Sequence, residues 1–239
     1  MDRAAIIRDN LHRVQDQIAE AAAKAGRDPR EVKLVGVTKY VDATDARHLY
    51  DAGCHVLGES RPQQLWEKAG DDVFAGARPE WHMIGALQSN KARKTVALGP
   101  TIHSVDSYRT LAKINKAAEQ EDRIAEVLIE VNCSGDPEKH GLPPSQVEQD
   151  IRELDMFRNV RVVGLMTMGP RAGGAEAARK SFALLRELRD KHGPQAPAGH
   201  DVKELSMGMS GDFAEAIAEG ATIVRIGSSL WEGVRPSKA

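Results

Sequence analysis

The sequence predicts an α/β fold in the form of a single (β/α)₈ barrel with an extra helix at its amino terminus. Short apolar runs rich in β-branched residues alternate with segments of helical period along the whole chain. Such alternation implies parallel strands, because each helix must return the chain to the same end of the sheet. Eight such units fit into 239 residues, and eight is the number that closes a TIM-type barrel. An open, doubly wound sheet remains the alternative, since strand order cannot be read from sequence.

The individual elements follow from periodicity and capping residues. Apolar side chains recur every three or four positions over residues 7–22, and Gly26 and Pro29 end this first helix. Eight strands are predicted over residues 33–39, 54–60, 80–86, 102–107, 126–134, 160–168, 204–210 and 222–229. Helices are predicted over residues 44–53, 62–70, 90–99, 108–120, 144–154, 175–192 and 212–220. Pro62, Ser107 and Gly53 stand at helix ends as expected for their residue types. No boundary stands out, so residues 1–239 are expected to form one domain.

Composition argues against several classes of protein. Lys plus Arg total 33 and Asp plus Glu total 35, so a net charge of −2 leaves no basic footprint for nucleic acid or an anionic membrane. No segment approaches the roughly 20 apolar residues of a membrane span, and the charged amino terminus does not resemble a signal peptide. Cys54 and Cys133 lack metal-binding spacing and are expected to be reduced, buried thiols. We therefore expect a cytoplasmic protein.

The first candidate for chemistry is a lysine at a strand end, because function gathers at the carboxyl ends of barrel strands. Lys39 directly follows the apolar run LVGVT. A lysine in this position is often only solvated, and position alone favours that interpretation. The functional interpretation is an amine that attacks a carbonyl group and holds it as a Schiff base.

Two Ser/Gly turns follow the last two predicted strands. Gly227 and Ser228 come after the run TIVRI, and Ser210 precedes Gly211. Loops in these places commonly bind phosphate, because glycine lets backbone N–H groups approach an anion and serine adds a hydroxyl donor. An ordinary turn, or an N-cap role for Ser210, is the competing interpretation. The presence of two such turns favours phosphate binding.

Polar residues are also expected inside the strands. Arg225 should face the same side of its strand as Gly227, and a guanidinium that points into a barrel is costly unless it is paired. Arg225 is therefore either part of a buried ion pair or a donor to the ring nitrogen of an aromatic ligand. His82 and His103 are expected to be hydrogen-bonded core histidines. The eight histidines show no metal-binding spacing, so no metal site is expected.

Taken together, the strand ends resemble those of a known family. The segments that carry the resemblance are LVGVTK, GES, WHMIGALQSNK, SVDS, VNCS with EKHG, GLM and LSMGMSGDFAEAIAEGATIVRIGSSLWEG. They are similar to the YggS/PROSC family of pyridoxal 5′-phosphate (PLP) homeostasis proteins, whose barrel resembles the N-terminal domain of alanine racemase. The resemblance implies PLP as cofactor and PLP fold type III without the C-terminal β-domain of the racemases.

The same resemblance assigns roles to individual residues. Lys39 matches the lysine that holds PLP as a Schiff base. The other matches are Met209 and Ser210 in one phosphate turn, Gly227 and Ser228 in the second, and Arg225 at the pyridine nitrogen. This sequence departs from the family at Ser60, where an asparagine near the cofactor is usual, and at Ala86, where histidine is frequent. Ser60 offers the cofactor a shorter hydroxyl in place of an amide.

The resemblance implies a monomeric PLP-binding protein that buffers PLP or delivers it to PLP-dependent apoenzymes without strong catalysis. A guanidinium keeps its proton, so the ring nitrogen beside Arg225 stays unprotonated and PLP becomes a weaker electron sink. The racemases use a tyrosine from a further domain, for which 239 residues leave no room, and Tyr40 is expected to point away from Lys39. Two alternatives remain: a PLP-dependent amino-acid racemase, and a PLP-independent barrel such as a Schiff-base aldolase or a sugar-phosphate isomerase.

Overall fold

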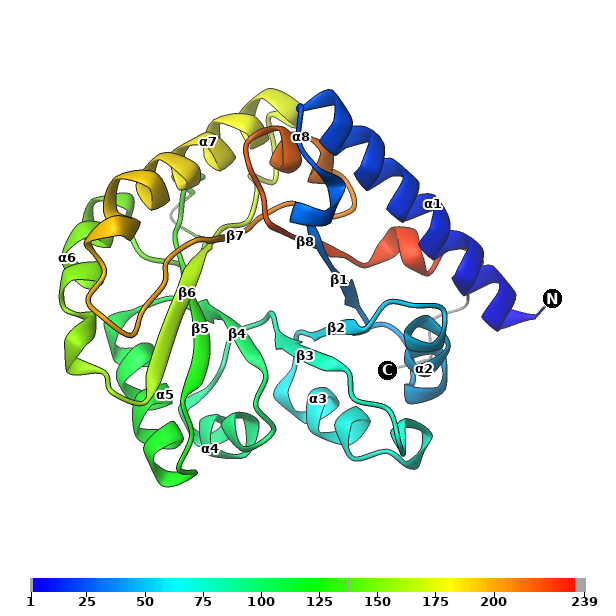
Figure 1. The fold of residues 1–239 in the computed structure, drawn as a ribbon, viewed down its shortest axis with the longest axis horizontal. Helices are drawn as coiled ribbons and strands as arrows, with labels where there is room; N and C mark the ends of the chain where they lie inside the picture. Colours follow the sequence, from blue (N-terminus) through cyan, green and yellow to red (C-terminus); the bar gives the residue numbers. More distant parts are fainter. Residues whose placement is uncertain (1, 137, 235–239) are drawn as a thin grey trace.

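The computed structural model describes residues 2–136 and 138–234 and confirms the barrel. Eight parallel strands pair in sequence order, and β8 pairs back to β1, which closes the sheet (Figure 1). The strands are Lys33–Val37 (β1), Val56–Glu59 (β2), Glu80–Met83 (β3), Thr101–Val105 (β4), Ala125–Glu130 (β5), Val160–Met166 (β6), Glu204–Ser206 (β7) and Ile223–Ile226 (β8). The closed order excludes the open, doubly wound sheet.

Eight helices surround the strands of the described residues: Arg3–Lys24 (α1), Ala43–Asp51 (α2), Pro62–Ala69 (α3), Ser89–Ala97 (α4), Tyr108–Gln120 (α5), Val147–Arg152 (α6), Gly174–His192 (α7) and Phe213–Ala218 (α8). The extra helix α1 packs against α8 and α2, so it takes the place in the ring that a helix after β8 would fill (Figure 1). The Asn10 side chain of α1 donates to the carbonyls of Leu230 (3.1 Å) and Glu232 (2.8 Å). These bonds fasten the first helix to the segment that follows β8.

Some predicted elements are too long. The helix expected over residues 144–154 consists of a 3₁₀ turn, Pro144–Gln146, then α6, then a second 3₁₀ turn, Leu154–Met156. Pro143 and Pro144 have no backbone N–H, which limits regular helix at this start. The predicted start of α5 agrees with the structure: Ser107 is its N-cap and accepts the N–H of Thr110.

The last two strands end early, at Ser206 and Ile226. Gly208 takes a φ of 90°, outside the strand region, and therefore ends β7 soon after it begins. Gly227 leads from β8 into a short 3₁₀ helix, Ser228–Leu230 (η6). Both turns therefore leave the sheet and carry their backbone N–H groups to the rim of the barrel.

Side chains pack in two separate places, outside and inside the barrel. The outward side chains of the strands join those of the helices in one large apolar cluster, which includes the fully buried Leu49, Leu65 and Phe182. A second, much smaller apolar cluster consists of Val35, Leu128, Met166 and Ile223 with partly buried neighbours. We call these regions the shell and the interior of the barrel.

The two cysteines behave as the sequence predicts. Cys54 and Cys133 are free and buried, and burial raises the pKa of each thiol to about 12. A thiol with this pKa stays protonated and is a poor nucleophile at neutral pH. Among the described helices, none has the length and apolar character to cross a membrane.

Candidate functional site

A cavity of about 300 Å³ opens at the carboxyl ends of β1, β2, β7 and β8. Its lining includes all seven residues that the sequence assigns to the site: Lys39, Ser60, Met209, Ser210, Arg225, Gly227 and Ser228. The sequence did not single out Val37, Ile84 and Met168, which also line the cavity, and Tyr40 lines it against expectation. Ala86 is exposed and lies outside this lining.

Lys39 stands on a firmly held strand end. Thr38, the residue before it, donates its N–H to the carbonyl of Gly58 (2.9 Å) and its hydroxyl to Glu59 (2.6 Å). The Lys68 amine of α3 donates to the carbonyl of Thr38 (2.8 Å) and forms a buried ion pair with Glu59. Sequence reasoning missed this pair, because a single lysine in an amphipathic helix resembles a solvated surface residue.

The prediction for Tyr40 is wrong. The Lys39 amine lies 4.8 Å from the centroid of the Tyr40 ring, and both residues line the cavity. Strict alternation of side chains applies only within a strand, and β1 already ends at Val37. Lys39 and Tyr40 belong to the turn that follows, where neighbouring side chains can lie on the same side.

The two Ser/Gly turns meet at one point of the cavity rim. The Ser210 hydroxyl oxygen accepts the N–H groups of Gly227 (3.3 Å) and Ser229 (3.5 Å), so one hydroxyl and two backbone donors converge. Ser210 is not the N-cap of α8, because that position belongs to Asp212. Asp212 instead accepts the N–H of Met209 (2.6 Å) and holds the first turn in shape.

Arg225 is buried at 4% exposure and lines the cavity from the interior. Its guanidinium donates to the Ser206 hydroxyl oxygen (2.5 Å) and to the carbonyl of Thr167 (3.0 Å). The described residues provide no carboxylate within ion-pair distance, so the buried ion pair considered from sequence is not formed. Burial lowers the pKa of Arg225 to about 10, against the opposing effect of the Glu130 and Asp212 carboxylates. Arg225 therefore stays charged at neutral pH, and three of its five N–H groups have no partner among the described residues.

His82 and His103 are hydrogen-bonded core histidines, as predicted. His82 Nδ1 lies 2.6 Å from His103 Nε2, and His103 Nδ1 lies 2.8 Å from the Ser206 hydroxyl. Burial lowers the pKa of both imidazoles, and that of His103 falls well below its ordinary value. Both histidines are therefore neutral at neutral pH.

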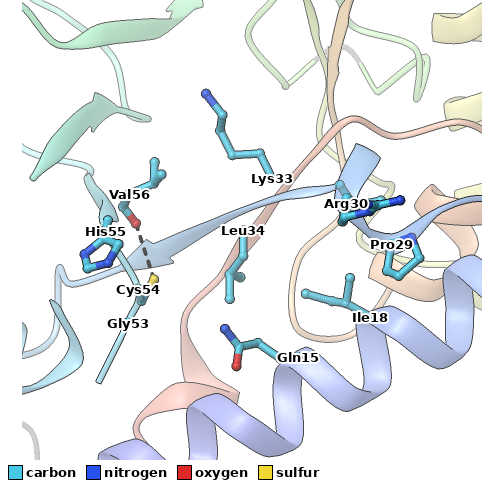
Figure 2. A pocket seen from close by; sticks show the side chains of 11 residues that line it. Gln15, Ile18, Pro29, Arg30, Lys33, Leu34, Gly53, Cys54, His55 and Val56 are labelled. Atoms are coloured by element: carbon cyan, nitrogen blue, oxygen red, sulfur yellow. Dashed lines mark hydrogen bonds between the residues drawn. The ribbon is translucent and has the colours of Figure 1, made fainter. Parts of the chain in front are cut away.

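A different cavity, of about 450 Å³, lies between α1 and the amino ends of β1 and β2 (Figure 2). Its lining includes Gln15, Ile18, Leu34 and Cys54. The Cys54 thiol donates to the carbonyl of Val56 (3.5 Å) and is protonated, so it offers no nucleophile. Since barrel sites form at the carboxyl ends of strands, we assign the functional site to the cavity around Lys39.

The fold and the site together define a class, the (β/α)₈ barrels with a lysine after the first strand and two Ser/Gly turns after the last two strands, all lining one cavity. A family profile described as "Alanine racemase, N-terminal domain" matches residues 10–236. A pyridoxal phosphate homeostasis protein of Aquifex aeolicus is 39% identical over 223 residues, covering 93% of this chain and 96% of that protein. A human protein of the same name is 33% identical over 232 residues, covering 92% of this chain and 84% of the human protein. The chain therefore belongs to the pyridoxal phosphate homeostasis proteins within the alanine racemase N-terminal domain family, which confirms the resemblance.

Solved structures agree with this placement. The crystal structure of an unknown protein from Bifidobacterium adolescentis superposes with a TM-score of 0.90 at 36% identity, covering 96% of this chain and 97% of the other. PipY of Synechococcus elongatus, solved with PLP bound, has a TM-score of 0.75 at 33% identity, with coverages of 89% and 99%. Alanine racemase of Streptomyces lavendulae shares the fold at 17% identity and a TM-score of 0.74; the match covers 98% of this chain and 58% of the racemase.

Proposed function

We propose that this chain binds PLP through Lys39 and acts in vitamin B6 homeostasis as a carrier that buffers or delivers PLP. The observation that carries the proposal is the composition of one cavity. It combines a strand-end amine, two backbone N–H groups beside a serine hydroxyl, and a buried guanidinium with unused donors. Relatives named pyridoxal phosphate homeostasis proteins, and PipY with PLP bound, support the same ligand.

The residues fit the polar groups of PLP one by one. The N–H groups of Gly227 and Ser229 converge on the Ser210 hydroxyl oxygen in two long hydrogen bonds, and a phosphate at this point would accept from the same donors, because convergent backbone N–H groups favour anions. The free N–H groups of Arg225 suit the pyridine nitrogen, which is a hydrogen-bond acceptor. The Lys39 amine would hold the aldehyde carbon as a Schiff base, with a C=N bond in place of the C=O bond and the aldehyde oxygen lost as water.

The character of Arg225 supports a carrier over an enzyme. PLP, when bound, supplies an electron sink, and that sink is strongest when the ring nitrogen is protonated. Arg225 holds its own proton at neutral pH, since its pKa of about 10 lies well above 7. It therefore donates a hydrogen bond to the ring nitrogen without protonating it, and the ligand stays a weak electron sink.

A PLP-dependent racemase is the second candidate, because the cavity contains a second ionisable group, Tyr40, besides Lys39. Racemisation needs acid–base groups on opposite faces of the substrate carbon. Among the described residues that line the cavity, the ionisable side chains are Lys39, Tyr40 and Arg225. The Lys39 amine lies 4.8 Å from the Tyr40 ring centroid, so these two groups approach from the same side. This arrangement supports binding without efficient racemisation.

The remaining parts of the proposal concern the setting of the protein. We infer a monomeric, single-domain, cytoplasmic protein whose partners are PLP and the PLP-dependent apoenzymes that receive it. The free, buried Cys54 and Cys133 support a reducing compartment, where disulfides are rare.

Reductive labelling tests the proposal directly. The protein is incubated with PLP, the C=N bond is reduced with borohydride, and the modified peptide is identified by mass spectrometry. We expect the label on Lys39, its loss in Lys39→Ala, and full retention in Lys116→Ala, which removes an exposed lysine of α5. A label spread evenly over surface lysines, or retained in Lys39→Ala, contradicts the proposal.

Exchange of the α-proton of amino acids in heavy water separates the two candidates. The PLP-loaded protein is expected to exchange at rates near that of free PLP. Exchange at the ordinary enzyme rates of roughly 1–10³ s⁻¹, dependent on both Lys39 and Tyr40, would instead establish the racemase.

A further inference from the structure

A continuous chain of hydrogen bonds runs from the cavity through the interior of the barrel. Arg225 Nη1 lies 2.5 Å from the Ser206 hydroxyl oxygen, which lies 2.8 Å from His103 Nδ1. His103 Nε2 lies 2.6 Å from His82 Nδ1. These residues belong to β8, β7, β4 and β3, and β4 is not a neighbour of β7 in the sheet. The chain therefore crosses the interior.

The chain ends on an ion pair at the opposite, amino-terminal end of the barrel. His82 Nε2 lies 2.9 Å from a carboxylate oxygen of Glu80, and the same oxygen accepts a hydrogen bond from the Lys33 amine at 2.7 Å. Figure 2 shows the Lys33 side chain extending away from α1, whereas its neighbour Leu34 points toward that helix. Lys33 and Glu80 thus meet on the inner side, at the first residues of β1 and β3.

The two charged ends fix the direction of every bond. Arg225 can only donate, so the Ser206 oxygen accepts from it. At the other end the Glu80 carboxylate can only accept, because its hydrogen bond from His82 holds its pKa down at about 2. His82 therefore donates from Nε2. Because burial keeps both imidazoles neutral, His82 Nδ1 accepts from His103 Nε2, and His103 Nδ1 accepts from the Ser206 hydroxyl. His103 donates to His82, and His82 donates to Glu80.

The stability of the barrel does not explain this row of buried polar side chains. Branched apolar side chains usually fill a barrel interior, and a buried polar group costs free energy even when it is hydrogen-bonded. Ser206 and His103 are fully buried, His82 is 1% exposed, and the apolar interior cluster stands beside them. Each link makes the next oxygen or nitrogen a better acceptor, since hydrogen bonds in series polarise one another. The polarisation ends at the guanidinium that faces the cavity.

We infer that His82, His103 and Ser206 are positioning residues through which Glu80, at the far end of the barrel, orients Arg225 and keeps its proton in place at the ligand ring. This inference rests on the proposed function, because Arg225 is taken to face the pyridine nitrogen of PLP. The Thr167 carbonyl fixes the second edge of the guanidinium at 3.0 Å, so the orientation of the remaining N–H groups depends on the Ser206 contact.

Two variants interrupt the chain of hydrogen bonds at its centre, and a third keeps it connected. Ser206→Ala removes the hydrogen bond to Arg225. His103→Leu removes the hydrogen bonds that join Ser206 to His82. We expect each to weaken PLP affinity about fivefold, the effect of losing one hydrogen bond, and to shift the absorption band of bound PLP. His103→Gln retains one acceptor and one donor and is expected to stay within about twofold of wild type. The matched control is Ser181→Ala, which changes a buried serine of α7 in the shell. It should leave the absorption band of bound PLP and the PLP affinity unchanged.

A measurement without PLP tests the bond directions separately. Long-range ¹H–¹⁵N spectra of the cofactor-free protein report which imidazole nitrogen carries hydrogen. We expect His82 and His103 to be neutral with the proton on Nε2. A proton on Nδ1 of either ring reverses the chain and overturns the inference.

The outcomes distinguish this inference from the proposed function. If wild type takes no PLP at Lys39, the proposed function is wrong. If wild type binds PLP at Lys39 but Ser206→Ala and His103→Leu, still folded by thermal unfolding, keep its band and affinity, the proposed function stands and the positioning chain is refuted.

Discussion

The shell and the interior of this barrel are packed by opposite rules. In the shell, apolar side chains of strands and helices form one large cluster that contains the fully buried Phe182 and Leu49. In the interior, the apolar cluster around Val35 and Met166 shares its space with a polar chain that ends at Arg225. Apolar burial is the main favourable term in folding, whereas buried charge opposes it. The contrast indicates that the shell maintains the fold and the interior serves the cavity.

The largest expected effect comes from a cavity in the shell. Phe182→Ala should lower the free energy of unfolding by about 3–5 kcal/mol, because a fully buried ring is lost and its site cannot collapse completely. Phe182→Leu, which keeps most of the volume, should cost clearly less. Denaturant unfolding measures both, and reductive labelling of the fraction that remains folded should still reach Lys39. If Phe182→Ala folds but no longer binds PLP, the shell also determines ligand binding, and the proposed separation of roles between shell and interior is wrong.

The next effect concerns Arg225 in the interior, where a substitution should change PLP affinity rather than stability. Arg225→Met removes a buried cation but also leaves the Ser206 hydroxyl and the Thr167 carbonyl without their donor, so the two effects oppose each other and the unfolding free energy without PLP should change little. PLP affinity should fall by at least about tenfold, because hydrogen bonds from a charged donor are lost. Parallel denaturant unfolding and fluorescence titration with PLP measure the two quantities. A loss of stability without a loss of affinity gives Arg225 a structural role only.

The buried histidines predict a dependence of stability on pH. Burial lowers the pKa of His82 and His103 in the folded state, so between pH 6.5 and those lower values the unfolded chain binds more protons. Stability should therefore decrease as the pH falls below about 6.5, by up to about 1.4 kcal/mol per pH unit for each histidine. In His103→Gln the slope should be shallower. An unchanged slope excludes His103 as its source.

The smallest effect comes from the outer edge of the shell. Ser107 caps α5 by accepting the N–H of Thr110, and Ser107→Ala should cost about 1 kcal/mol of stability. Ser107→Asp supplies another capping acceptor and should restore most of the loss. PLP affinity should not change in either variant, and thermal unfolding together with PLP titration checks both expectations.

Much of the fold was accessible from the sequence, because strand and helix periods are local properties. The same holds for the site, since Lys39 and Gly227 follow apolar strands and the carboxyl ends of parallel strands share one rim. The chain from His103 to Ser206 was not accessible, because it depends on which side chains meet across the interior, 103 residues apart. Tyr40 was misplaced because the exact end of β1 decides which alternation rule applies. Strand and helix ends remain the least predictable features of a sequence.

The attachment of α1 to the segment after β8 has a consequence for biosynthesis. Asn10 reaches the carbonyls of Leu230 and Glu232, residues that leave the ribosome more than 200 positions later. The turn that begins at Gly227 leads directly to Leu230, so the amino-terminal helix can hold this turn only after residue 232 has been synthesised. Contacts of such sequence separation form late in folding. A nascent chain should therefore acquire its proposed affinity for PLP only after residue 232 has left the ribosome.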